Sequence, residues 1–113
     1  MMPRNMSFAL TTEQFKNRTK TVTRRLGWKF LRPSDILMGC EKCMGLKPGE
    51  KINRLGLIRG VSAWREPLTD ITPDDVEREG FPGKDCRWFV EMFCREMGGQ
   101  PYQRVTRIEF EYL

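Results

Sequence analysis

One short basic stretch, residues 20–25, constrains the fold of this chain more than any other segment. Its sequence, Lys-Thr-Val-Thr-Arg-Arg, alternates hydroxyl-bearing and other side chains and is half β-branched, which predicts a β-strand. In a strand, Thr21, Thr23 and Arg25 share one face. Two adjacent arginines in a strand indicate either a functional role for their charges or access of the strand to solvent. The segment therefore predicts either the wall of an anion- or nucleic-acid-binding groove or a solvated edge strand, and its pattern alone favours neither.

The chain length and the distribution of charge point to one domain, residues 1–113, with a polyanionic partner. Residues 1–65 contain 14 Lys or Arg and 4 Asp or Glu, a balance of +10. Residues 66–113 contain 6 Lys or Arg and 11 Asp or Glu, a balance of −5. A basic half beside an acidic half favours RNA or a related polyanion as partner, unless the two halves mix their charges on a common surface.

Several classes of protein are excluded by what the sequence lacks. No apolar run approaches the roughly 18 residues of a membrane span. Arg4 and Asn5 interrupt any apolar core of a signal peptide, so a cytoplasmic protein without membrane attachment is expected. The sequence contains no histidine, which removes Ser–His and Cys–His catalysis and every zinc site with a histidine ligand. We infer no obligatory protein partner.

The first half predicts short strands joined by tight turns. Strands are expected at residues 7–10, 20–25, 36–40 and 52–64. Gly56 and Gly60 are the expected bend points of the long strand, and the apolar run 36–40 predicts burial on both faces. Thr11 and Gln14 have capping-box spacing, which predicts a helix over residues 12–17. This arrangement favours a small barrel over an open α/β sheet.

The second half predicts two helices and a closing strand. Thr72 as cap, Pro73 at the first position and acidic residues in the first turn begin a helix that Gly80 ends. A longer helix is expected over residues 85–97, and a strand over residues 105–112. The apolar stripe of the longer helix is expected to face the core through Phe89, Met92, Phe93 and Met97.

The four cysteines give only a weak metal signal. Cys40 and Cys43 form a C-x-x-C pair, but Cys86 and Cys94 are eight residues apart and lie about 80° off a common helix face. We therefore expect reduced cysteines rather than a zinc site or redox exchange, and neither a metal nor a cofactor. Trp28 is expected in the core, with base stacking beside the neighbouring cations as the alternative.

A catalytic site without histidine needs another base. A threonine hydroxyl becomes a nucleophile only when its proton is removed, which leaves lysine or a carboxylate for that task. Lys20 lies among arginines, which favour its neutral form. Glu79 could protonate a leaving amine, although spacing alone does not single it out among the carboxylates of the second half.

The residues of segment 20–25, followed by Arg-Pro-Ser-Asp-Ile-Leu at 32–37, resemble the ASCH domain, a PUA-like β-barrel family linked to RNA binding. The resemblance covers nearly the whole chain and implies an α+β fold, a PUA-like mixed β-barrel of about five or six strands with two or three flanking helices. Small bacterial members are N4-acetylcytidine amidohydrolases that use a lysine, a threonine and a glutamate. Those catalytic roles fall on Lys20, Thr23 and Glu79.

The resemblance and the charge pattern together name the expected site and its alternatives. RNA or a modified nucleoside is the expected partner. The residues expected to bind it are Arg18, Thr21, Arg24, Arg25 and Trp28. Hydrolysis of the amide of an N4-acylated cytidine is the first expectation. A non-catalytic RNA-binding module and a metal-independent ribonuclease are the alternatives. Arg18 and Ser34 stand where the family usually has glycine, and the segment 40–51 is longer than in the compact amidohydrolases.

Overall fold

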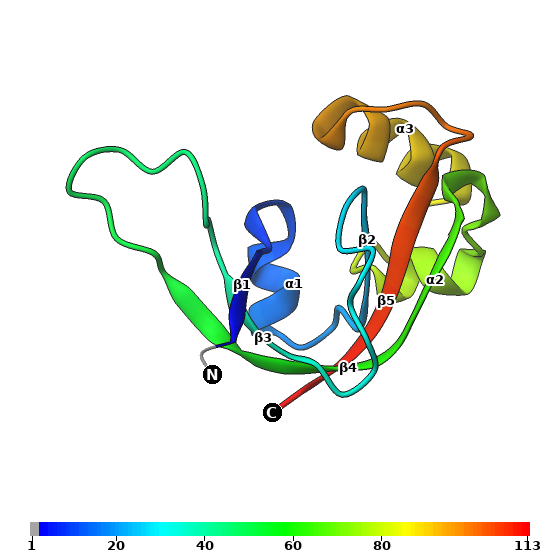
Figure 1. The fold of residues 1–113 in the computed structure, drawn as a ribbon. Coiled ribbons are helices and arrows are strands. Elements are labelled where there is room, and N and C mark those ends of the chain that lie inside the picture. The colour runs from blue at the N-terminus through cyan, green and yellow to red at the C-terminus, as the bar shows by residue number, and fades with distance from the viewer. Residues whose placement is uncertain (1–2) are drawn as a thin grey trace.

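The structure, a computed structural model, describes residues 3–113, which form one curled sheet with helices packed beside it (Figure 1). The strands are β1 (Arg4–Ser7), β2 (Val22–Arg25), β3 (Ile36–Cys40), β4 (Arg54–Pro67) and β5 (Arg104–Tyr112). The α-helices are α1 (Thr12–Lys16), α2 (Pro73–Arg78) and α3 (Cys86–Met97), and the short 3-10 helices are η1 (Ala9–Thr11) and η2 (Leu68–Asp70). None of the helices in this described part is long and apolar enough to span a membrane.

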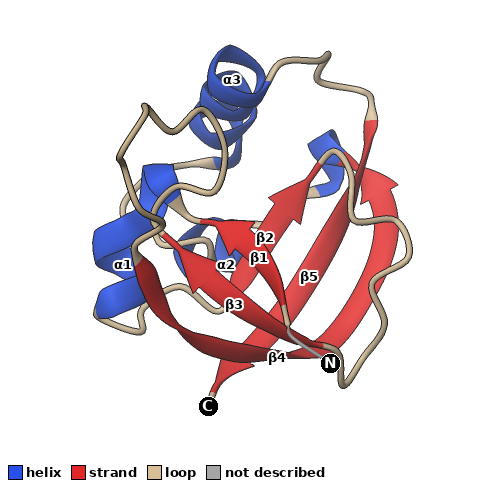
Figure 2. Ribbon diagram, turned by 60° about the vertical axis from the view of Figure 1, so that its left-hand side comes forward, coloured by secondary structure: helices blue, strands red, loops and turns tan. Residues whose placement is uncertain are grey.

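The five strands form one sheet in the order β1-β3-β4-β5-β2. The β1–β3 pair is parallel and the other pairs are antiparallel. The long strand β4 pairs with β3 through its first half and with β5 through most of its length, and its register with β5 shifts between Gly60 and Ser62. Such a bulge bends and twists a strand, and Figure 2 shows the sheet curled into a half-barrel. The expected α+β, PUA-like barrel fold is confirmed.

Two apolar cores stabilise this arrangement. The first lies within the curl of the sheet and consists of Met6, Phe8, Phe15, Leu31, Leu37, Ile58, Ile108 and Phe110. The second lies where the helices of the second half pack on the sheet and consists of Leu68, Ile71, Val76, Phe89, Met92, Phe93 and Val105. Burial of these side chains is the main favourable contribution to folding.

The first strand and helix differ from the sequence-based expectation. The predicted strand at residues 7–10 is wrong, because β1 ends at Ser7 and the chain turns into η1, with the hydroxyl of Thr12 donating to the carbonyl oxygen of Phe8 at 2.9 Å. The capping box is also wrong, since the Thr11 side chain makes no capping hydrogen bond. Gln14 instead donates to the carbonyl oxygen of Gly80 at 3.3 Å and joins α1 to the second half. The predicted cap at Thr72 is confirmed, because its hydroxyl accepts from the Asp75 amide at 3.2 Å.

Burial also departs from expectation at three positions. Ile36 in β3 is 41% exposed, so this strand is not buried on both faces, and Met97 at the end of α3 is 37% exposed. The basic segment is the largest departure. β2 begins at Val22 and lies at the edge of the sheet, yet Arg24 is only 2% exposed, so the solvated-edge interpretation is wrong.

Candidate active site

A cavity of about 150 Å³ lies between η1, β2 and α3. In Figure 1, α3 lies above β2 and α1 lies to its left. The polar lining residues are Ser7, Thr11, Lys20, Thr23, Arg24, Arg25 and Glu79. The apolar lining residues are Phe8, Ala9, Leu10, Phe81, Phe89, Met92, Phe93 and Met97. Cavities of this size accommodate a single six-membered ring such as benzene.

Lys20 and Glu79 form a buried ion pair in the polar wall. Both residues are 2% exposed. Lys20 Nζ donates to Glu79 Oε1 at 2.6 Å and to the carbonyl oxygen of Glu79 at 2.8 Å. Burial lowers the pKa of Lys20, and attraction to Glu79 opposes this effect. Lys20 therefore loses its proton more easily than a solvent-exposed lysine does.

Local backbone structure places the two members of this pair. Glu79 is the C-cap of α2, and Gly80 ends the helix with φ of +105°. A side chain at Gly80 would be strained at that φ, and its Cβ would lie 2.8 Å from Gln14. Thr21 fixes the segment that carries Lys20, since its amide donates to the Arg78 carbonyl at 2.8 Å.

Thr23 and Arg25 form the second polar contact of the cavity. Thr23 is 3% exposed, and its hydroxyl oxygen accepts from Arg25 Nε at 3.1 Å. The Arg25 guanidinium lies over the Phe8 ring, 4.9 Å from its centroid. Burial lowers the pKa of Arg25 to about 10, so this cation stays charged at neutral pH. Among the described side chains, no hydrogen bond joins Lys20 directly to Thr23.

Arg24 links the cavity to acidic residues of the second half. Its guanidinium forms ion pairs with Glu66, Asp75 and Glu79. Burial alone would lower the pKa of Arg24, but the three carboxylates raise it. Asp75 also binds Arg107, and these two arginines outweigh burial and lower the pKa of the Asp75 carboxyl to about 2. The charges of the two halves are therefore partly neutralised inside the molecule.

The predicted site residues separate into two groups. Lys20, Thr23, Arg24, Arg25 and Glu79 line the cavity. Arg18, Thr21 and Trp28 do not. Arg18 lies over the Tyr112 ring, 5.4 Å from its centroid. The hydroxyl of Thr21 accepts from Arg78 Nε at 3.3 Å.

Trp28 lines a separate surface hollow, together with Arg4, Gly27, Lys29 and Phe30. Its indole packs partly against the first core, as expected of a tryptophan in this segment. Phe30 in the same hollow is 89% exposed.

Sequence reasoning missed the acidic partners of Arg24 and the apolar wall. Asp75 was recognisable only as an acid in the first turn of a helix, and Glu66 only as one of many carboxylates of the second half. No local signal pairs either one with Arg24, because the contacts span 51 and 42 residues of chain. The helical spacing of Phe89, Met92 and Phe93 indicated a core face, and these residues also line the cavity.

The cysteines do not gather around a common centre. Within residues 3–113, no three side chains of the metal-ligating types lie close enough together to hold an ion. All four cysteines are free, and burial raises the pKa of the Cys40 thiol to about 11, which keeps that thiol protonated.

Comparisons with known proteins concern the fold. No family model and no curated protein matches this chain. The protein EF3133 from Enterococcus faecalis, with the family model DUF984, superposes with a TM-score of 0.71 and 13% identity, over 100% of this chain and 81% of that one. An ASCH domain from Lactobacillus crispatus superposes with a TM-score of 0.68 and 12% identity, over 96% and 78% of the two chains. The chain therefore has an ASCH-like fold, as the resemblance of its sequence predicted.

Proposed function

We propose that the cavity binds the base of an N4-acylated cytidine and hydrolyses its amide. The observation that carries this proposal is the presence of Lys20, Thr23 and Glu79 in one cavity wall, each no more than 3% exposed. These residues supply a base, a nucleophile and an acid without histidine. The cavity volume suits one pyrimidine ring, so the ribose stays outside.

The first half-reaction transfers the acyl group to the protein. Transfer of the proton of Lys20 to Glu79 leaves a neutral amine and a neutral carboxylic acid, with no change in the net charge of the pair. The amine turns toward Thr23 and takes the hydroxyl proton while Thr23 Oγ forms a bond to the acyl carbon. The C–N4 bond breaks, Glu79 protonates N4, and cytidine leaves.

The second half-reaction releases the acid and restores the site. Water attacks the acyl ester of Thr23 and gives a proton to Glu79, while Lys20 gives its proton to Thr23 Oγ. Glu79 then returns a proton to the amine of Lys20, which restores the starting ion pair. The carboxylic acid leaves with the acyl group. Arg25, which already donates to Thr23, stabilises the negative oxygen that forms in both half-reactions.

The experiment is incubation of the protein with N4-acetylcytidine, with chromatographic detection of cytidine and acetate. We expect both products in equal amounts. N4-acetylcytidine that stays intact under conditions where the protein is folded would contradict the proposal. A parallel incubation with single-stranded RNA tests the ribonuclease alternative through the appearance of shorter fragments.

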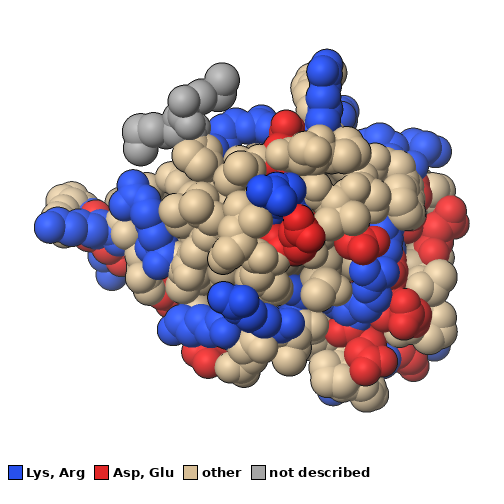
Figure 3. Space-filling view, turned by 90° about the horizontal axis from the view of Figure 1, so that it is seen from below, with Lys and Arg blue, Asp and Glu red and all other residues tan. Residues whose placement is uncertain are grey.

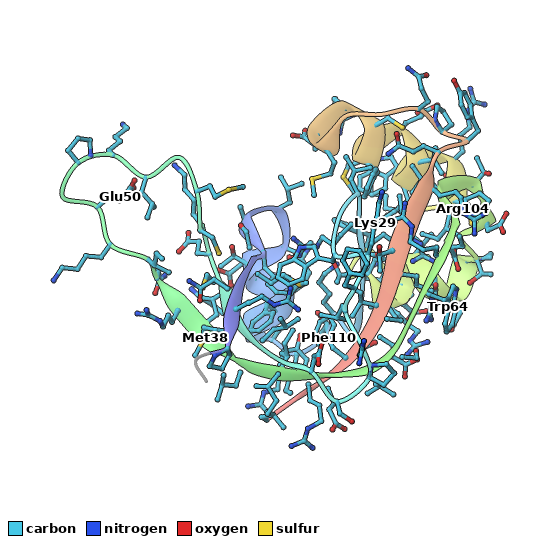
Figure 4. All side chains as sticks on the ribbon, in the orientation of Figure 1. Lys29, Met38, Glu50, Trp64, Arg104 and Phe110 are labelled. Carbon is cyan, nitrogen blue, oxygen red and sulfur yellow. The ribbon has the colours of Figure 1, made fainter. Side chains whose placement is uncertain are left out.

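A second candidate function, binding of single-stranded RNA, is favoured by the hollow around Trp28. Phe30 exposes nearly its whole ring there, and Arg4 and Lys29 add positive charge (Lys29 is labelled in Figure 4). Exposed aromatic rings beside cations are typical of proteins that stack single-stranded bases. On the face of the molecule seen from below, Figure 3 shows acidic and basic side chains mixed together, without a continuous positive surface.

Replacement of one exposed aromatic residue tests this second candidate. Phe30→Ala should weaken binding of a single-stranded oligonucleotide by about 1–3 kcal/mol, because one stacking contact is lost. Tyr102→Ala is the matched control, since Tyr102 is also exposed, at 75%, but lies in the turn before β5. Equal affinities of the two variants in fluorescence titrations would remove Phe30 from the binding surface.

A further inference from the structure

Arg24 has an unusual environment for a cavity residue, because three carboxylates share its guanidinium. Nη1 donates to Glu79 Oε2 at 3.2 Å. Nη2 donates to Asp75 Oδ2 at 2.5 Å and to Glu66 Oε2 at 3.1 Å. A guanidinium bound at both ends cannot rotate without breaking charge-assisted hydrogen bonds, so its position is fixed.

Asp75 is in turn fixed from the opposite side. Arg107 Nε donates to Asp75 Oδ2 at 2.7 Å, and Arg107 Nη2 donates to Asp75 Oδ1 at 3.0 Å. The Arg107 guanidinium lies 4.4 Å from the centroid of the Trp64 ring (Trp64 is labelled in Figure 4), and Arg78 approaches Asp75 at 3.8 Å. With a pKa near 2, Asp75 keeps its negative charge throughout the neutral range.

This arrangement divides one positive charge among several acids. Glu79 receives one hydrogen bond from Arg24 and one from Lys20, each on a different carboxylate oxygen. If Arg24 faced Glu79 alone, its full charge would oppose the transfer of a proton from Lys20. Asp75 and Glu66 compensate part of that charge and so reduce this opposition.

We propose that Asp75, supported by Glu66, is a positioning residue that acts through Arg24 to orient Glu79 and to set the proton affinity of the Lys20–Glu79 pair. This inference rests on the proposed amide hydrolysis. Asp75 does not line the cavity and makes no hydrogen bond to Thr23. Its effect on the reaction is indirect, through the fixed guanidinium of Arg24.

The sign of the electrostatic effect follows from the charges around Lys20. The charge of Glu79 favours the protonated form of Lys20, whereas the charges of Arg24 and Arg25 disfavour that form. Loss of the negative charge of Asp75 leaves the cations of the cluster uncompensated. The pair then binds protons less tightly, and both limbs of its pH–rate profile move to lower pH, because the limbs belong to the coupled pair.

The test compares the pH dependence of N4-acetylcytidine hydrolysis by the wild type and Asp75→Asn. We expect kcat to fall by about 10- to 100-fold, as for other residues that orient a reacting group, with little change in KM. Both limbs should move to lower pH by on the order of one unit. Asp74→Asn is the matched control, since it removes the same charge from the exposed side of the same helical turn. Limbs that stay in place in Asp75→Asn would overturn the inference.

Two further measurements test the inference if Asp75→Asn does not fold or if the wild type is inactive. If Asp75→Asn does not fold, Glu66→Gln replaces it, because the Glu66 side chain is 13% exposed and its loss leaves Asp75 on Arg24. A smaller shift in the same direction supports the inference, and no shift overturns it. If the wild type does not hydrolyse N4-acetylcytidine, the proposed function fails. NMR titration of Lys20 then tests the electrostatic link by itself: a lower pKa in the variant supports it, and an unchanged one overturns it.

Discussion

Two neighbouring segments of this chain contain similar residues in opposite environments. The segment 20–25 carries Lys20 and Arg24, both 2% exposed and both paired with carboxylates. The segment that follows carries Lys29, which is exposed, and Phe30, which is 89% exposed. The positive charges of Lys20 and Arg24 are neutralised inside the molecule, whereas that of Lys29 faces solvent and is available to a partner.

The difference shows that a basic sequence does not by itself make an anion-binding surface. The acidic second half supplies Glu66, Asp75 and Glu79, which neutralise the cations of the first half in the interior. A buried cation with such partners is suited to proton transfer and to orientation of a reacting group. A solvated cation beside an exposed ring is suited to binding of a phosphate or a base.

The largest expected effect concerns Thr23, the proposed nucleophile in the segment 20–25. Thr23→Val keeps the β-branched shape and removes the hydroxyl. We expect turnover of N4-acetylcytidine to fall by several orders of magnitude while the protein stays folded, because no other residue replaces the attacking oxygen. Thr19→Val, at an exposed position just before the segment, is the control. Equal activity of the two variants would contradict the assignment of Thr23.

Replacement of a buried and of an exposed lysine should change the stability of the protein by different amounts. Lys20→Met leaves the buried carboxylate of Glu79 without one of its cations and should reduce the free energy of unfolding by about 3–5 kcal/mol. Lys29→Met should change it by no more than about 0.5 kcal/mol, because Lys29 is exposed. Urea denaturation measures both values. Similar losses would mean that the two lysines do not differ in environment.

Acid should weaken the buried cluster through Asp75. Because the folded pKa of this carboxyl, about 2, is lower than its usual value of 3.8, its stabilisation is complete above about pH 5 and is lost as the pH falls toward 2. We expect the stability difference between the wild type and Asp75→Asn to decrease by about 2 kcal/mol over that range. A difference that stays constant from pH 5 to pH 2 would show that Asp75 is not held as an anion.

The smallest expected effect concerns the salt dependence of RNA affinity. If RNA binds at the hollow around Trp28, Lys29→Met should reduce the dependence of affinity on salt by about one phosphate contact. Lys20→Met should leave that dependence unchanged, since its charge is paired inside the molecule. Fluorescence titrations at several salt concentrations measure the two slopes, and a reduced slope in Lys20→Met would place RNA against the buried segment.

Local sequence patterns predicted which segments form helices and strands better than they predicted how deeply those segments are buried. The strand at residues 20–25, the cap at Thr72 and the helix after Asp85 depend on residues close together in the chain, and each forms within a few residues of its predicted bounds. The strand predicted at residues 7–10 failed because β1 is fixed by its parallel pairing with β3, more than 30 residues away.

The candidate site was harder to predict from the sequence, because its contacts join residues that are far apart in the chain. The resemblance to the ASCH domain named Lys20, Thr23 and Glu79, which spacing alone did not connect. The burial of Arg24 and its pairing with Asp75 required the sheet order that brings β2 beside β5, with α2 close to both. No pattern along the chain encodes that neighbourhood.

The most direct measurement of the central claim is the mass of the protein during turnover. Rapidly quenched mixtures with N4-acetylcytidine should contain protein that has gained one acetyl group, located by peptide fragmentation on Thr23. The acetyl group should be absent from Thr23→Val. An acetyl group on another residue, or release of cytidine by Thr23→Val at the wild-type rate, would contradict the account.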